Sequence, residues 1–314
     1  MQPQYHRNIR IYAPATVANL GPGFDIMGMV IEGAGDILQM NIASGDSLII
    51  RNESGFPLPG DVEKNVITPA VRAMLDAWGG SLSVEVTILQ KIRPGSGIGS
   101  SSASSAAAVV GLNELLGNPF DQQQLITFAM EGERLVSGGT AHADNAGPAV
   151  AGGIVLIRGY DPLDYIRIPV PERLYAAVIH PHITVNTLES RAVMRKEIPQ
   201  RDAVTQWGNV GGLVAGLLTS DMGLVGRSLK DVVAEPYRKH FIPGYDELKA
   251  ALASTEGVLG SNIAGSGPSV FALCNGPEAA AKAGEVMAGH FKNIGIAADL
   301  YAGPVSEKGA HVIG

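Results

Sequence analysis

A glycine- and serine-rich segment, Arg93 to Ser105, holds the residues best suited to chemistry. A strand is predicted before it, over 83–91, and a buried helix after it, over 103–116. Glycines let backbone N–H groups turn toward a ligand, and a helix N-terminus adds unpaired N–H groups and a positive dipole end. Serine hydroxyls there can reach phosphate oxygens or a magnesium ion. The segment therefore predicts a site for a phosphate chain, with a flexible linker as the alternative.

The spacing of this loop differs from that of the common phosphate-binding fingerprints. Lys-Ser or Lys-Thr does not close it, as a Walker A loop would require. The pattern Gly95-x-Gly97-x-x-Ser100 also misses the third glycine of the dinucleotide-binding pattern. The sequence holds no Gly-x-Ser-x-Gly, which argues against a hydrolase nucleophile elbow.

Composition limits the class of protein. The 314 residues are 46% hydrophobic and 17% charged, which indicates a core-forming globular chain of one large or two ordinary domains. The net charge of −7 disfavours broad nucleic-acid binding. The single Cys274 excludes an intrachain disulfide, and we expect a buried, inert thiol. The polar first ten residues and the absence of a long apolar run predict a cytoplasmic protein without a membrane span.

Strands and helices alternate through the first half of the chain, and the elements of the second half have an α+β order. A turn signal at 159–162 is the best boundary, and it divides the chain into residues 1–160 and 161–314. Strands are predicted over 9–12, 36–42, 47–51, 83–91, 152–157, 174–179, 257–264, 269–274 and 296–301. Helices are predicted over 65–78, 103–116, 121–136, 187–197, 203–218, 245–254 and 278–291.

Three glycine-bearing segments, 14–25, 94–105 and 262–269, together resemble the GHMP kinases, which phosphorylate small molecules. The family's loop Pro-x-x-x-Gly-Leu-Gly-Ser-Ser-Ala is similar to Arg93-Pro-Gly-Ser-Gly-Ile-Gly-Ser-Ser-Ser102, with isoleucine for leucine and serine for alanine. Within the family, four further segments resemble the homoserine kinases. They are Asn19-Leu-Gly-Pro-Gly-Phe-Asp25, His142-Ala-Asp-Asn145, Thr187-Leu-Glu-Ser-Arg191 and Glu235-Pro-Tyr-Arg238.

This resemblance implies a fold, an activity and a set of ligands. The fold is α+β, with an N-terminal domain like ribosomal protein S5 and a ferredoxin-like C-terminal domain. The activity is transfer of a phosphoryl group from ATP, with Mg²⁺, to L-homoserine on the route to threonine, by a homodimer. Other GHMP kinases, acting on an isoprenoid precursor or a sugar, are the nearest alternative, and a non-catalytic regulatory member is a further one.

Site residues follow from the matched motifs. For the metal, the resemblance implies Ser101 and Glu133, although one extra residue between Ser137 and His142 leaves Glu131 as a second candidate. For ATP, it implies Asn65, Pro94, Gly95, Ser96, Gly97, Ile98, Gly99, Ser100, Ser101, Ser102 and Ser104. A helix cap is the alternative role for Asn65.

An amino-acid substrate needs a carboxylate for its ammonium group and a guanidinium for its carboxylate. Asp25 suits the first need, and Arg191 and Arg238 suit the second. Hydrogen bonds are expected from Asn19, His142 and Asn145, and catalytic roles from Asn145, Thr187 and Arg191. The plain alternatives are a turn role for Asp25, a core position for His142 and a helix cap for Thr187.

Two features of the sequence remain outside this set. Asp144 is the competing candidate for a general base, whereas the neighbouring Asn145 fits a base-free mechanism because a neutral amide does not take up a proton near neutral pH. His180-Pro181-His182 invites a metal site but lacks a third ligand, so we interpret it as the end of a strand.

Overall fold

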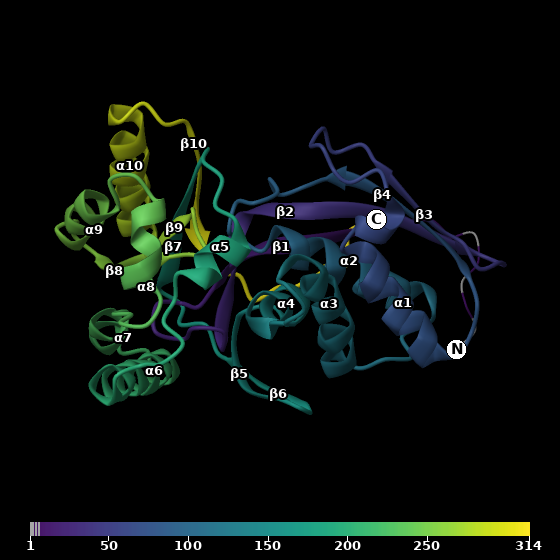
Figure 1. Cartoon of the computed structure of the whole chain (residues 1–314), viewed down its shortest axis with the longest axis horizontal. Coiled ribbons are helices and arrows are strands. Elements are labelled where there is room, and N and C mark those ends of the chain that lie inside the picture. The colour runs from purple at the N-terminus through teal and green to yellow at the C-terminus, as the bar shows by residue number, and fades with distance from the viewer. Residues whose placement is uncertain (1–2, 4, 6) are drawn as a thin grey trace.

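The computed structural model describes residues 3, 5 and 7–314, so part of the polar N-terminal stretch lies outside it. Two sheets organise the chain, and helices cover each of them (Figure 1). The larger sheet occupies one side of the molecule and the smaller sheet the other. Within the described residues, no helix is both long and apolar enough to cross a membrane.

The larger sheet has seven strands in the order β11-β1-β2-β4-β3; β5 also pairs with β2, and β6 pairs with β5. Its pairs are antiparallel except for β3 with β4. The long β2 strand curves through a bulge opposite Pro14 and Ala15. The strands are β1 (Ile9–Ala18), β2 (Met27–Ala43), β3 (Leu48–Asn52), β4 (Ser83–Gln90), β5 (Ile154–Tyr160), β6 (Leu163–Ile168) and β11 (His311–Val312).

Four helices and a short 3₁₀ turn accompany this sheet. The α2 helix is buried on nearly every side, which explains its run of small residues, because other elements pack around it. In Figure 1 these helices lie together beneath the strands. They are η1 (Val62–Lys64), α1 (Ile67–Trp78), α2 (Ser100–Leu115), α3 (Gln122–Val136) and α4 (Ala143–Ala151).

The smaller sheet has four antiparallel strands in the order β10-β7-β9-β8. Its strands are β7 (Leu174–Pro181), β8 (Val258–Ile263), β9 (Val270–Asn275) and β10 (Ala298–Pro304). Its helices are α5 (Thr187–Ala192), α6 (Gln200–Thr219), α7 (Met222–Ser228), α8 (Glu235–Arg238), η2 (Lys239–Phe241), α9 (Tyr245–Ala253) and α10 (Pro277–Asn293). The predicted two-domain α+β fold is confirmed.

Several predicted boundaries differ from the structure. The division at residues 160 and 161 falls in the turn of the β5–β6 hairpin, so the first sheet continues to Ile168. The chain also returns to that sheet at its end, where β11 pairs with β1. The α5 helix ends well before residue 197, because the residues that follow it are mostly exposed and provide no buried face.

The α2 helix begins at Ser100 rather than at 103, so the serines of the loop form its first turn. The α4 helix was not predicted, because Pro148 and two glycine-containing flanks obscure its pattern. Cys274 lies in β9 and is fully buried, as expected, and burial raises the pKa of its thiol to about 12.

Candidate active site

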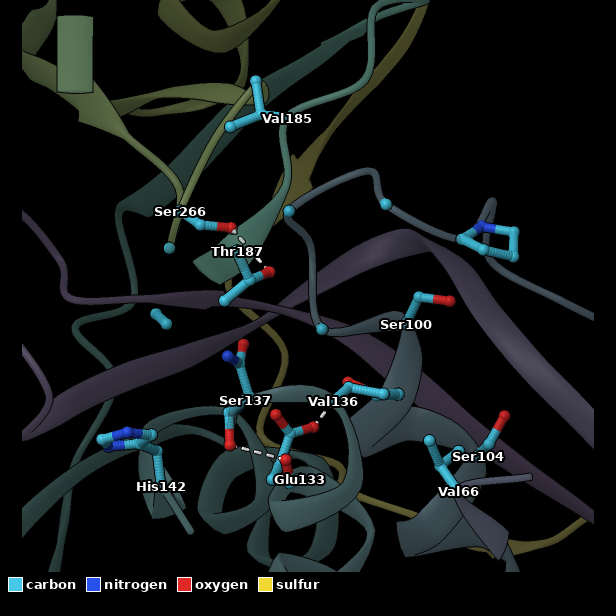
Figure 2. A pocket seen from close by; sticks show the side chains of 18 of the residues that line it. Val66, Ser100, Ser104, Glu133, Val136, Ser137, His142, Val185, Thr187 and Ser266 are labelled. Carbon is cyan, nitrogen blue, oxygen red and sulfur yellow. Dashed lines mark hydrogen bonds between the residues drawn. The ribbon is translucent and has the colours of Figure 1, made fainter. Parts of the chain in front are cut away.

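A cavity of about 320 Å³ lies between the two sheets and is lined by residues from both halves of the chain. Figure 2 shows Thr187 and Ser266 on one side of it, with Glu133, Ser137 and His142 on the opposite side. The glycine-rich loop runs along the cavity and leads into α2, where Ser100 is labelled. The cavity is therefore bounded by the loop, by α3 and α4, and by segments of the second half.

The loop exposes the N-terminal end of α2 to the cavity. Gly99 is the cap residue of this helix, and its φ of 70° is a conformation that glycine adopts without strain. A Cβ atom on Gly99 would lie 2.0 Å from the Thr16 hydroxyl oxygen. The first N–H groups of a helix lack partners within it, so this end favours an anion. The predicted phosphate site has the backbone that it requires.

A buried ion pair anchors the loop to the larger sheet. Lys91 Nζ lies 2.9 Å from Asp36 Oδ2, and both side chains are almost fully buried. The Asp36 carboxylate also accepts hydrogen bonds from the Ile92 N–H and from the Ser104 hydroxyl. Lys91 Nζ in turn donates to Ser100 Oγ at 2.8 Å. The network joins β2, β4 and the first turns of α2, and it occupies the hydroxyl of Ser104, for which ATP binding was predicted.

Glu133 is the carboxylate that contacts Ser101 and Ser102. Its Oε1 accepts hydrogen bonds from Ser101 Oγ at 2.5 Å and from Ser102 Oγ at 2.6 Å. Glu133 is only 8% exposed and lines the cavity. Glu131, the alternative, instead pairs with Arg134 at 3.0 Å in a more exposed position. Carboxylate and hydroxyl oxygens are the donors that Mg²⁺ prefers, so Glu133 and Ser101 fit this ion.

Charged side chains gather at another part of the cavity. Arg191 Nη2 donates to both Asp25 oxygens, at 2.9 and 3.0 Å. The same nitrogen lies 3.0 Å from His142 Nε2, whose other ring nitrogen is 3.6 Å from Asp25. Since a guanidinium can only donate, Nε2 is the acceptor and the imidazole is neutral. Burial lowers the pKa of His142, which agrees with this protonation state.

Arg238 and Asn19 connect this charged cluster to the segment at 262–269. Arg238 is 4% exposed, and it donates to the Gly265 carbonyl at 2.8 Å. The Asn19 amide donates to the same carbonyl at 3.1 Å and accepts from the Asp25 N–H. The guanidinium carbons of Arg191 and Arg238 lie 5.6 and 5.1 Å from the centroid of the Phe24 ring. The two arginines thus converge beside one carboxylate.

Other predicted residues also line the cavity. Asn145 Oδ1 accepts from the Thr16 hydroxyl at 2.7 Å. Thr187 Oγ1 lies 3.4 Å from Ser266 Oγ (Figure 2). The cap of α5 is Asn186, so a cap role for Thr187 is wrong. Asn65 lines the cavity, and its side chain accepts from the Ile67 N–H, although the cap residue of α1 is Val66.

Asp144 contributes a buried carboxyl group to the cavity wall. It is 4% exposed, and burial, followed by the nearby Asp25 and Glu133 charges, raises its pKa to about 8. The group is therefore mostly protonated at neutral pH when no cation is bound. A protonated carboxyl group can donate a hydrogen bond but cannot accept the proton of a substrate hydroxyl.

The structure brings most of the predicted site together. Ser96, Ile98 and Ser102 are buried outside the cavity lining, since they lie at closely packed points of the loop. The sequence analysis missed the roles of Lys91, Asp36, Thr16 and Ser266. Lys91 carried a signal, as a charged residue that ends a buried strand directly before the loop. The other three are identified only by their tertiary contacts.

Comparisons with known proteins agree with this geometry. Residues 65–153 match the GHMP kinases N-terminal domain, and residues 213–293 match the GHMP kinases C-terminal domain. The chain is 45% identical to a homoserine kinase of Chlorobium phaeovibrioides, over 98% of this chain and 100% of that protein. It is 35% identical to a homoserine kinase of Methanococcus maripaludis, over 85% and 88%.

Solved structures give the same result. The crystal structure of a homoserine kinase from Cytophaga hutchinsonii superposes with a TM-score of 0.93 at 44% identity, and each chain is covered completely. A galactokinase from Lactococcus lactis superposes with a TM-score of 0.72 at 15% identity, over 98% and 95% of the two chains. The second likeness shows the shared fold alone.

Proposed function

The chain belongs to the GHMP kinases, and on that basis we propose that it transfers the γ-phosphoryl group of ATP to the side-chain hydroxyl of L-homoserine. The product is O-phospho-L-homoserine, on the route to threonine. The homoserine kinases to which the chain is similar over nearly its whole length support this choice within the family. A cytoplasmic location and a homodimer stay predictions, and analytical ultracentrifugation measures the second.

The observation that carries the proposal is the charged cluster of Asp25, Arg191 and Arg238 in the same cavity as the phosphate loop. An amino acid presents an ammonium group next to a carboxylate, and this cluster presents charges of the opposite signs side by side. Asp25 would receive the ammonium group, while the arginine forks would receive the carboxylate. A neutral sugar has no charged groups to pair with Asp25 and the arginines, so it would gain less from this cluster than an amino acid.

The nucleotide would lie along the loop with its phosphates at the N-terminus of α2. Asn65 would contact the base, and the backbone of Gly95, Gly97 and Gly99 would cradle the phosphates. Ser101 and Glu133 would hold Mg²⁺, which neutralises charge on the transferred phosphoryl group when bound. The buried Lys91–Asp36 pair keeps the loop in place, so the cradle is formed before the nucleotide arrives.

On the substrate side, Arg191 would place the amino acid and Thr187 would lie beside the reacting hydroxyl. Asn145, held by Thr16, would orient that hydroxyl without removing its proton. Phosphoryl transfer through a loose transition state depends mainly on positioning and charge stabilisation. We therefore propose catalysis without a carboxylate base.

A substrate panel tests the proposed reaction. With Mg²⁺ and ATP, the purified protein should release ADP far faster with L-homoserine than with mevalonate, galactose or L-serine. L-Serine is shorter by one carbon, so its hydroxyl should fall short of the γ-phosphate. Equal turnover of mevalonate would contradict the assignment within the family. A protein that binds ATP but releases no ADP with any of the four would be a regulatory member instead.

A further inference from the structure

A cluster of two histidines and one aspartate lies at the end of the smaller sheet, outside the catalytic cavity. The antiparallel pairing of β7 and β10 places Asp299 opposite His180. The chain then turns after Pro181, and the His182 N–H donates to the Ala297 carbonyl at 2.7 Å, which holds the second imidazole beside the first. The sequence supplied two candidate metal ligands, and the fold adds the third.

The ligand atoms of the three side chains lie close to one another. His182 Nε2 lies 2.9 Å from Asp299 Oδ2, and His180 Nδ1 lies 3.7 Å from the same oxygen. One ligand atom from each residue lies within 4.8 Å of the other two. In a tetrahedral site with bonds of about 2.0 Å, the ligand atoms lie about 3.3 Å apart. Modest side-chain movements would therefore complete the coordination geometry.

His180 supplies an independent reason to expect a ligand here. Its side chain is 2% exposed, and its Nδ1 atom has no hydrogen-bond partner within the described part of the chain. A separation of 3.7 Å from the Asp299 oxygen is too long for a hydrogen bond. Burial lowers the pKa of this imidazole and so favours the neutral form, which has a lone pair for a cation. A buried nitrogen without a partner is costly, and a metal bond would satisfy it.

We propose that His180, His182 and Asp299 form a binding site for a divalent transition-metal cation of the Zn²⁺ type. Two imidazole nitrogens and one carboxylate oxygen form a familiar ligand set for this ion, with a fourth position left to water. Both histidines line a surface hollow of about 220 Å³, which gives that water room. The site differs chemically from the all-oxygen pair of Ser101 and Glu133, which suits Mg²⁺.

Arg93 connects this cluster to the phosphate loop. Its Nε atom lies 3.8 Å from Asp299 Oδ2, and its guanidinium stacks on Phe56 at 5.2 Å. A cation on Asp299 would compete with this guanidinium for the same carboxylate. Removal of the Arg93 charge should therefore strengthen metal binding, whereas removal of His182 or Asp299 as a ligand should weaken it.

Metal titration of the tag-free, full-length protein tests the site. The protein is stripped with a chelator and titrated with Zn²⁺ alone against a competing dye, without nucleotide or Mg²⁺. We expect one Zn²⁺ per chain, and we expect His182→Ala and Asp299→Asn each to weaken binding at least ~10-fold. His240→Ala removes an exposed histidine on η2 and should leave the affinity unchanged. Because His182 is itself exposed, its variant should fold normally, which circular dichroism verifies.

Two further measurements make the result specific. Arg93→Met should tighten Zn²⁺ binding several-fold, since it removes a repelling positive charge. Co²⁺ in place of Zn²⁺ should give the intense visible absorption of a four-coordinate ion, and His182→Ala should abolish it. Zn²⁺ affinity that is the same in His182→Ala, Asp299→Asn and the unaltered protein would overturn the proposal, as would the absence of a bound equivalent.

Discussion

Replacement of Asp144 by asparagine should stabilise the protein, by an amount that depends on pH. Burial raises the pKa of this carboxyl from 3.8 to about 8, and each unit corresponds to about 1.36 kcal/mol. In the unfolded chain the group ionises near its ordinary pKa, so above that pH the folded state binds more protons than the unfolded state. Stability is therefore lost as pH rises from about 4 to about 8.

The size of the effect follows from this window. At pH 7 the carboxyl destabilises the folded state by at most about 4 kcal/mol, and at pH 5 by less than about 2 kcal/mol. An asparagine has the same shape and no charge to lose. Asp144→Asn should therefore exceed the unaltered protein in stability, and its advantage should grow between pH 5 and pH 8.

Urea unfolding at these two pH values, without Mg²⁺ or nucleotide, measures the difference. Asp46→Asn, at an exposed loop position, is the control and should change stability little at either pH. An Asp144→Asn protein that is no more stable than the unaltered protein at pH 8 would refute the reasoning. So would an advantage that does not grow with pH.

Three other substitutions test the site. Asp36→Asn breaks a buried ion pair and should lower the free energy of unfolding, measured in urea, by about 3 kcal/mol. The control Glu63→Gln breaks an exposed pair and should lower it by less than about 1 kcal/mol. Gly99→Ala should weaken ATP binding in calorimetry more than Gly95→Ala does. Both glycines have a positive φ, but only at Gly99 would a Cβ atom clash with a neighbour. Equal losses of affinity would argue against a phosphate-binding role for the backbone at Gly99. Arg191→Lys should raise KM for L-homoserine at least ~10-fold with little change in KM for ATP, because the bidentate fork is lost, and an equal rise in both would count against this role.

Local patterns in the sequence predicted much of this structure. The phosphate loop was recognisable because strand, glycines, serines and helix follow one another in the chain, and α3 was bounded by Asp121, which forms a capping box. The hairpin of β8 and β9 was predicted for the same reason. Each of these features depends on neighbouring residues.

Features that depend on distant residues were not predictable in this way. Asp36 lies in the middle of β2, and nothing nearby in the sequence indicates its partner Lys91. Asp299 contacts His180 only because β10 pairs with β7. The boundary predicted at residues 160 and 161 has the same explanation. A Gly-Tyr-Asp-Pro turn looks the same in a linker between domains and in a hairpin, and only the pairing of β5 with β6 distinguishes the two.

The central claim is that phosphoryl transfer here depends on a metal-holding carboxylate and not on a carboxylate base. The most direct test is to measure kcat and KM with L-homoserine for Asp144→Asn and Glu133→Gln, with folding verified by circular dichroism. A general base is most effective when its pKa lies near the working pH, and the pKa of Asp144 is raised to about 8, so Asp144 is a realistic candidate for a base. We predict that Asp144→Asn lowers kcat by at most roughly 10²-fold and Glu133→Gln by more. A fall of about 10⁴-fold for Asp144→Asn, with KM for homoserine unchanged, would contradict the account.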